Sequence, residues 1–145
     1  KLKKGSEIFQ IWFDPNLHES LYEEANYSDY KSEIFLVKKE DGKETKIISD
    51  INNQIDLKSD SIQIYQHSFT KGTYDHEIGQ DRFHSIFIQY GRLKINDQTF
   101  NSGDFLIVES EVSLSVEILS DTKVFEIISP TELPYKTYAE MHNIS

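Results

Sequence analysis

Apolar and polar residues alternate along most of the chain in short runs that are separated by turn-forming residues. Between Ser61 and Ile128, runs rich in isoleucine, valine, phenylalanine and tyrosine are interrupted by Gly, Asn, Asp and Ser. One such run recurs roughly every 8 to 12 residues, which is typical of a β-sandwich or barrel. The expected strands span residues 61–69, 82–90, 92–96, 98–100, 105–109, 112–118 and 123–128.

The N-terminal pattern is less regular. Residues 7–14 have apolar side chains on both sides and predict a strand covered on both faces, with Trp12 as an aromatic plug between layers. Residues 15–31 predict an irregular connection that lies over the body of the domain. Within it, Asn16 is expected to cap a short helical turn, with Glu19 three residues later.

Two further strands are expected before the dense series, over residues 34–37 and 45–49, on either side of an Asp-Gly turn at residues 41–42. After Pro130 the tail has no clear period and predicts an extension that packs on the surface or on a neighbour. We therefore expect an N-terminal strand and linker over residues 1–32, one β domain over 33–130 and a C-terminal extension over 131–145.

Composition excludes several classes of function. The 145 residues suit one domain, and the absence of cysteine excludes disulfides, thiolate metal sites and cysteine nucleophiles. The net charge of −10 opposes direct binding to nucleic acid. No apolar run approaches the roughly 20 residues that span a bilayer, and no signal-peptide pattern follows the basic residues 1–4, so we expect a cytoplasmic protein.

Residues 85–108, SIFIQYGRLKINDQTFNSGDFLIV, resemble the cupin family. The segment has a strand ending at Gly91, a hairpin turn at Asn96-Asp97, and Gly103 before the next strand. Glycine permits a sharp exit from a strand and a backbone conformation that a Cβ would obstruct. Asp104 is expected to bond local backbone amides as a turn residue. The resemblance implies an all-β cupin fold, a double-stranded β-helix of the jelly-roll kind.

A second resemblance covers the beginning of the chain. FQIWFDPNL at residues 9–17 and ANYSDY at residues 25–30 are similar to the segment that follows the first cupin domain in pirin-like proteins. That family has two cupin domains in tandem, of which the first carries the metal. The resemblance therefore implies a C-terminal cupin domain, with an upstream metal-bearing domain or a second copy of this chain as its partner. The chain does not begin with Met, which suggests that it was cut from something longer.

Metal-dependent cupins use three histidines and a carboxylate, and the resemblance implies where these would fall. Counting from Gly91 and Gly103, the carboxylate position is His84, the histidine pair lies near residues 78–80, and the third histidine position is Leu106. Ile78, Gly79, Gln80 and Leu106 do not supply imidazoles. The resemblance therefore implies a domain without metal or other cofactor.

Near substitutes exist outside this register. His67, His76, Glu77 and His84 are a candidate site for iron or another divalent cation, since His76 and Glu77 fall in an expected loop over residues 70–80. The more ordinary interpretation is that they are solvated loop residues, together with one strand histidine held by a hydrogen bond.

His84 shares its strand face with Ile86 and Ile88, an arrangement typical of an interior histidine with satisfied hydrogen bonds. A weaker candidate is a small interior ligand pocket formed by His84, Ile86, Ile88 and Leu106, with His84 as its polar anchor. No nucleophile elbow, phosphate-binding loop or dinucleotide glycine pattern occurs.

Three functions remain open at this point. The first hypothesis is a non-catalytic cupin domain that packs against a metal-bearing domain or a second copy of itself. The second is a metal-dependent cupin enzyme, a dioxygenase or isomerase. The third is a metal-free module that binds a small apolar or sugar-like molecule.

Overall fold

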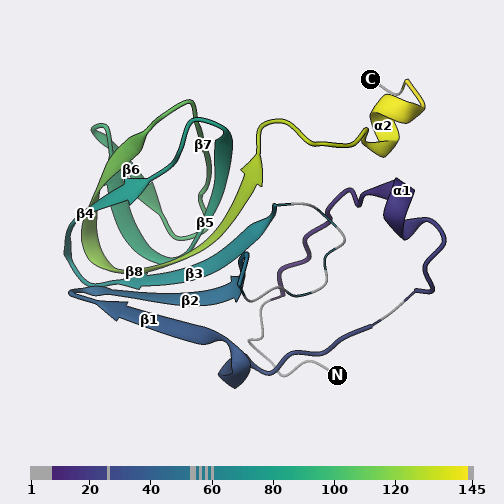
Figure 1. Ribbon diagram of the computed structural model, residues 1–145. Helices are drawn as coiled ribbons and strands as arrows, with labels where there is room; N and C mark the ends of the chain where they lie inside the picture. The colour runs from purple at the N-terminus through teal and green to yellow at the C-terminus, as the bar shows by residue number, and fades with distance from the viewer. Residues whose placement is uncertain are drawn as a thin grey trace.

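The computed structural model describes residues 8–25, 27–52, 55, 57, 59 and 61–143. These residues form one antiparallel eight-stranded sheet, with three short helical segments outside it (Figure 1). The all-β expectation is confirmed. The elements are α1 (Leu17–Ser20), η1 (Ser32–Ile34), β1 (Leu36–Glu40), β2 (Lys43–Ser49), β3 (Gln63–Phe69), β4 (Gly72–Glu77), β5 (Arg82–Ile95), β6 (Gln98–Asn101), β7 (Phe105–Glu109), β8 (Ser113–Pro130) and α2 (Tyr138–Met141).

Two long strands, β5 and β8, organise the sheet. They pair with each other, and β8 also pairs with β4 along its first half and with β3 along its second half. Because one strand serves two partners in succession, the sheet curls on itself, as the barrel formed by β4 to β8 in Figure 1 shows. The apolar core lies inside this curl and consists of Ile86, Ile88, Leu93, Leu106, Ile118 and Val124.

Gly91 lies within one long strand where the sequence predicted two separate strands. The strands expected over residues 82–90 and 92–96 belong to the single strand β5, Arg82–Ile95, whose register with β8 shifts on both sides of Tyr90. Gly91 has φ +93°, and a Cβ there would collide with the Asp121 carbonyl oxygen and Thr122. The strand therefore bends instead of ending. Similarly, residues 112–118 and 123–128 belong to the single strand β8.

The predicted turns of the C-terminal series are confirmed. Asn96 and Asp97 both have positive φ, +45° and +65°, as a two-residue hairpin between β5 and β6 requires. Gly103 has φ +94°. Asp104 accepts a hydrogen bond from the Asn101 backbone N–H at 2.7 Å, in the expected role of a turn residue.

Three further sequence expectations are wrong. Residues 8–14 form no strand, although both sides of the segment are apolar as in a doubly covered strand, because they pair with no strand in the described part of the chain. Phe9 instead packs on the outer face of the sheet against Phe87, with ring centroids 4.7 Å apart, while Trp12 is 84% exposed and plugs nothing. The loop expected over residues 70–80 contains β4, whose pairing with β8 overrides its polar composition.

The segment around α1 lies near the C-terminal segment. Asn16 caps α1 by accepting a hydrogen bond from the His18 N–H, as expected, although Glu19 takes no part in that bond. Asp14 accepts hydrogen bonds from the Tyr135 hydroxyl at 3.1 Å and from the Tyr138 N–H at 2.9 Å, which places α1 near α2 (Figure 1). No helix among the described residues is long and apolar enough to cross a membrane.

Candidate metal centre

Four titratable side chains from four strands meet inside the barrel: His67 of β3, His76 of β4, His84 of β5 and Glu126 of β8. Glu126 is at the centre of the group, and its side chain is 1% exposed. Its Oε1 lies 2.6 Å from His76 Nε2 and 2.7 Å from His84 Nδ1. Its Oε2 lies 2.8 Å from His67 Nε2. We call these four residues the histidine–glutamate cluster.

Strand alternation places each member of the cluster. Along β8, Val124 and Glu126 are buried while the residues between and beside them are more exposed. Along β4 the same alternation turns His76 toward the interior and leaves Glu77 exposed. Since β3, β4 and β5 all pair with β8, imidazoles on three different strands reach one carboxylate.

The outer nitrogens of two imidazoles are also held. His84 Nε2 lies 2.8 Å from the Ile78 carbonyl oxygen, and His67 Nδ1 lies 2.9 Å from the Thr45 hydroxyl. No buried side-chain nitrogen or oxygen lacks a hydrogen-bond partner among the described residues. The cluster is therefore a satisfied polar network in an apolar barrel, and its rings are fixed in orientation.

The environment sets the charge of the carboxylate. Burial favours its neutral form, but hydrogen bonds from His67, His76 and His84 outweigh burial and hold the pKa of Glu126 well below its usual range. For His67 burial is the stronger effect, and it lowers the pKa of the imidazole despite the hydrogen bond to Glu126. At neutral pH the cluster thus presents an ionised carboxylate and a neutral His67.

His84 lies between two acceptors. The Ile78 carbonyl oxygen can only accept, so the hydrogen bond at Nε2 requires a proton on that nitrogen. The other ring nitrogen, Nδ1, faces the ionised Glu126 and needs either a second proton or a cation in that place. A metal ion in the place of the proton between Nδ1 and Glu126 would leave the Nε2–H bonded to the Ile78 carbonyl, which holds the ring in the orientation that binding requires.

The donors fit a divalent transition-metal ion. His76 and His84 each offer one nitrogen and Glu126 offers one oxygen, and these three atoms all lie within 4.8 Å of one another. Two imidazoles and one carboxylate are a common ligand set for such ions and leave coordination positions open. The backbone carbonyl behind His84 is the kind of partner that metal-bound histidines have in proteins.

The cluster separates two spaces. Outside it is a hollow of about 550 Å³, whose lining includes Lys43, Thr45 and Tyr65 together with His67, His76 and Glu126; we call it the histidine hollow. Inside the barrel, the same three cluster residues border an apolar cavity of about 30 Å³, which has room for roughly one water-sized molecule. A molecule of substrate size therefore has space only on the outer side.

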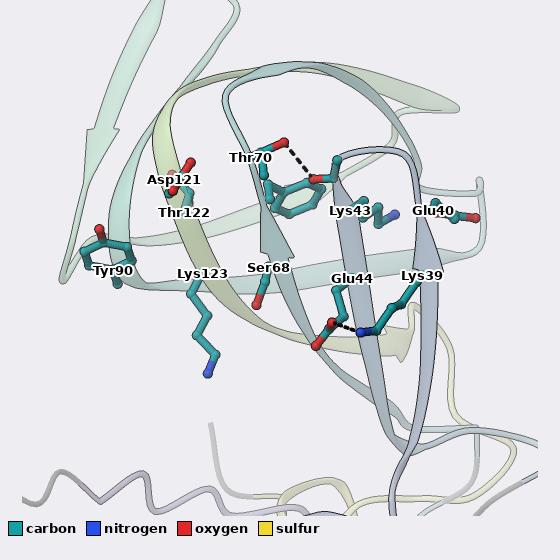
Figure 2. Close-up of a pocket in the computed structure, with 12 residues that line it drawn as sticks. Lys39, Glu40, Lys43, Glu44, Ser68, Thr70, Tyr90, Asp121, Thr122 and Lys123 are labelled. Carbon is teal, nitrogen blue, oxygen red and sulfur yellow. Dashed lines mark hydrogen bonds and ion pairs between the residues drawn. The ribbon is translucent and has the colours of Figure 1, made fainter.

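A second hollow of similar volume, about 510 Å³, lies on another part of the sheet (Figure 2). Its lining includes Lys39, Lys43 and Lys123, and we call it the lysine hollow. Lys39 and Glu44 form an exposed ion pair across it at 3.3 Å. It contains no histidine, and its charged side chains belong to the surface.

The structure brings together three of the four residues considered for a metal site from the sequence. His67, His76 and His84 belong to the cluster, whereas Glu77 is exposed at the rim of the histidine hollow, and Glu126 takes the place of the carboxylate. Glu126 had a signal in the sequence, because it shares a strand face with Val124 and Ile128. A charged residue at an inward position is rarely buried without partners.

The positions that the cupin resemblance assigned to histidine ligands hold no imidazole, as the sequence shows. Ile78 and Leu106 are 4% and 8% exposed and belong to the barrel interior. Of the residues considered for an interior ligand pocket, Ile86 and Leu106 line the small cavity, whereas His84 and Ile88 are not part of its lining. His84 of β5 is at the position assigned to the carboxylate, whereas His67 and His76 reach the interior from β3 and β4.

No model of a known protein family matches the sequence, and no curated protein matches it. Solved structures do match the fold. Quercetin 2,3-dioxygenase from Acinetobacter baumannii has a TM-score of 0.61 at 14% identity, over 81% of this chain and 47% of that one. KdgF from Halomonas sp. has a TM-score of 0.55 at 13% identity, over 74% and 96% of the two chains.

Bacterial pirin YhhW from Escherichia coli, in complex with nickel(II), has a TM-score of 0.54 at 17% identity, over 61% of this chain and 40% of that one. At such identities the likeness concerns the fold. The antiparallel curled sheet and these neighbours together identify it: the chain has the all-β cupin fold.

Proposed function

We propose that this chain binds one divalent transition-metal ion at His76, His84 and Glu126, and that the ion makes it a metal-dependent enzyme. The observation that supports the proposal is the convergence of imidazoles from separate strands on one buried carboxylate. A barrel interior of isoleucine, leucine and valine would be stable without these groups, since burying charge costs free energy. Their presence is best explained by a ligand that uses them.

Bound there, the ion would supply a Lewis acid with positions open to substrate or water. The residues of the chain prepare the site for it. The Ile78 carbonyl fixes the tautomer of His84, and hydrogen bonds keep Glu126 ionised. Apolar residues behind the cluster exclude bulk water, and the histidine hollow admits a molecule from the other side.

Metal binding by the purified chain tests this proposal. After treatment with a chelator, the protein is titrated with nickel(II) or zinc(II) in a calorimeter, and bound metal is measured by elemental analysis. We expect one equivalent for the natural chain and none for His76→Ala. His76 is the most exposed imidazole of the cluster, so its loss should leave the fold intact, as circular dichroism would verify.

His142→Ala is the matched control, because His142 is an exposed histidine in the C-terminal segment, bonded to the Tyr138 carbonyl. It should bind one equivalent like the natural chain. Failure of the natural chain to take up any of these ions, or equal uptake by His76→Ala, would refute the metal centre.

A second candidate is that the domain is a companion to another cupin domain or to a second copy of itself. Two observations favour it. The chain spans less than half of the dioxygenase and pirin chains that it matches. Its N-terminal segment also exposes large apolar side chains, among them Trp12 and Tyr22, at 84% and 89%. Such a surface is suited to a protein partner.

Trp12 is the only tryptophan, so its fluorescence reports on this surface directly. If two copies associate through the N-terminal segment, Trp12 emission should shift to shorter wavelength as concentration rises, and the sedimentation coefficient should increase in parallel. Emission that stays constant in a species that sediments as a monomer would argue against self-association.

A further inference from the structure

The two oxygens of Glu126 have different surroundings. Oε1 is in hydrogen-bond contact with His76 and His84, the two imidazoles of the proposed metal site, whereas Oε2 is in hydrogen-bond contact with His67. The nitrogen of His67 is not among the donor atoms that lie within 4.8 Å of one another. An ion placed between His76 and His84 therefore has Oε1 as its carboxylate ligand, and His67 lies behind that carboxylate.

His67 is held in turn by Thr45. The two residues are directly opposite each other on β3 and β2, and the Thr45 hydroxyl lies 2.9 Å from His67 Nδ1. Since Nε2 faces a carboxylate, a neutral His67 donates its single N–H there, and Nδ1 must accept. The hydroxyl is a donor in the right place for that arrangement.

We propose that His67 is a positioning residue and not a metal ligand, and that Thr45 fixes its tautomer through the chain of hydrogen bonds Thr45 to His67 to Glu126 Oε2. This inference rests on the proposed metal site. It assigns three residues of the cluster, His76, His84 and Glu126, as metal ligands and makes His67 a residue that orients one of them. The composition of the cluster alone would suggest four ligands. The carboxylate is thereby kept from rotating and presents one oxygen to the ion.

Supports of this kind matter for affinity, because a ligand that is already oriented loses less freedom when the ion binds. Removal of such a hydrogen-bond partner typically weakens metal binding by about 10- to 100-fold. Loss of the Thr45 hydroxyl should have a related effect through His67. Without a donor at Nδ1, the tautomer with its proton on Nδ1 becomes more accessible. That tautomer points the Nε2 lone pair at Oε2 and repels the carboxylate.

The first test separates a ligand from a support. His67→Gln keeps an N–H donor that can reach Oε2, so we expect it to bind one equivalent of cobalt(II) with affinity about tenfold lower than that of the natural chain. His76→Ala, which removes a ligand, should show no binding at the same concentrations. If His67→Gln loses cobalt as completely as His76→Ala does, His67 is a ligand and the inference is wrong.

The second test addresses the tautomer. Thr45→Val has nearly the shape of threonine without its hydroxyl, and we expect weaker cobalt(II) binding by about tenfold and a changed visible spectrum of the bound ion. Thr45→Ser restores the donor and should restore both affinity and spectrum. Thr99→Val, an exposed position on β6, is the control and should match the natural chain.

The spectrum distinguishes positioning from a general loss of stability, because a loosened fold lowers affinity without altering the geometry around the bound ion. Identical affinity and spectrum in Thr45→Val would overturn the role of Thr45. Failure of the proposed function gives a different result: the natural chain itself then binds no cobalt(II), and no variant differs from it.

Discussion

The histidine hollow and the lysine hollow have nearly the same volume, about 550 and 510 Å³, and share Glu40 and Lys43 in their lining. Their chemistry differs. The floor of the histidine hollow holds buried imidazoles that converge on a carboxylate, whereas the lysine hollow is lined by side chains such as Lys39 and Glu44 that pair at the surface (Figure 2).

The comparison teaches that size does not identify a site in this fold. An exposed pair such as Lys39 and Glu44 is screened by water and contributes little. A buried carboxylate must be compensated by its neighbours, so each partner is fixed in place and in protonation state. Preorganised donors of this kind, and not the volume of the hollow, make the histidine hollow the candidate for the proposed function.

The largest effect on stability is expected at the wall of the lysine hollow, where Gly91 adjoins Tyr90. Gly91→Ala combines an unfavourable φ with a collision against Thr122, and should lower the free energy of unfolding by about 3 kcal/mol. Gly103→Ala, with nearly the same φ but open space around it, should cost about 1 kcal/mol. Urea unfolding measures both, and equal losses would show that the close approach is unimportant. The loss of stability in Gly91→Ala would reflect backbone strain beside the lysine hollow and not the removal of a binding group.

The next effect distinguishes the charges of the two hollows. Glu126→Gln leaves three imidazoles without their anionic partner and should lower the free energy of unfolding by about 2 kcal/mol in the presence of a chelator. Glu44→Gln, the same change in the lysine hollow, should alter it by less than about 0.5 kcal/mol. A reversed order would contradict the comparison.

Acid should destabilise the metal-free chain in two stages. The pKa of His67 is lowered from 6.5 on folding, so the unfolded chain binds more protons below about pH 6.5, and stability falls as the pH drops from there through the folded pKa. The pKa of Glu126 is lowered from 4.5, so its contribution is present above about pH 4.5 and is lost as the pH falls below that value.

Urea unfolding at a series of pH values measures this profile. The lower stage should be reduced in Glu126→Gln and kept in Glu44→Gln. Stability that does not decline between pH 6.5 and pH 4 would mean that the cluster is not charged as described.

The smallest effect is expected for Lys123→Ala in the lysine hollow. Lys123 is half-buried on the surface of the sheet, and surface substitutions of this kind contribute little to folding, so the free energy of unfolding should change by less than about 0.5 kcal/mol, and affinity for nickel(II) should stay the same. A clear loss of metal affinity would show that the two hollows act together, and the distinction between them would no longer hold.

Much of the fold followed from local pattern. Residues 105–109 were expected as a strand and are β7, Phe105–Glu109, and the turn at Asn96-Asp97 is in place, because alternation and turn residues act over short distances. Residues 8–14 look like a strand that is apolar on both sides, but they pair with no strand among the residues that the structure describes. Residues 72–77 look like a loop and form β4 because β8 provides a partner. Whether a segment pairs as a strand depends on a second segment far away in the sequence, so the local pattern of either segment does not predict it.

The candidate site divides in the same way. By itself the sequence determined an all-β chain without cysteine, with His67, His76, Glu77 and His84 as candidate ligands and no imidazole at the histidine positions that the cupin resemblance assigns. Only the tertiary structure decided that Glu126, and not Glu77, completes the group. The choice depends on which strands pair with β8 and in which register, since a shift of one residue would turn Glu126 to the outer face of the sheet.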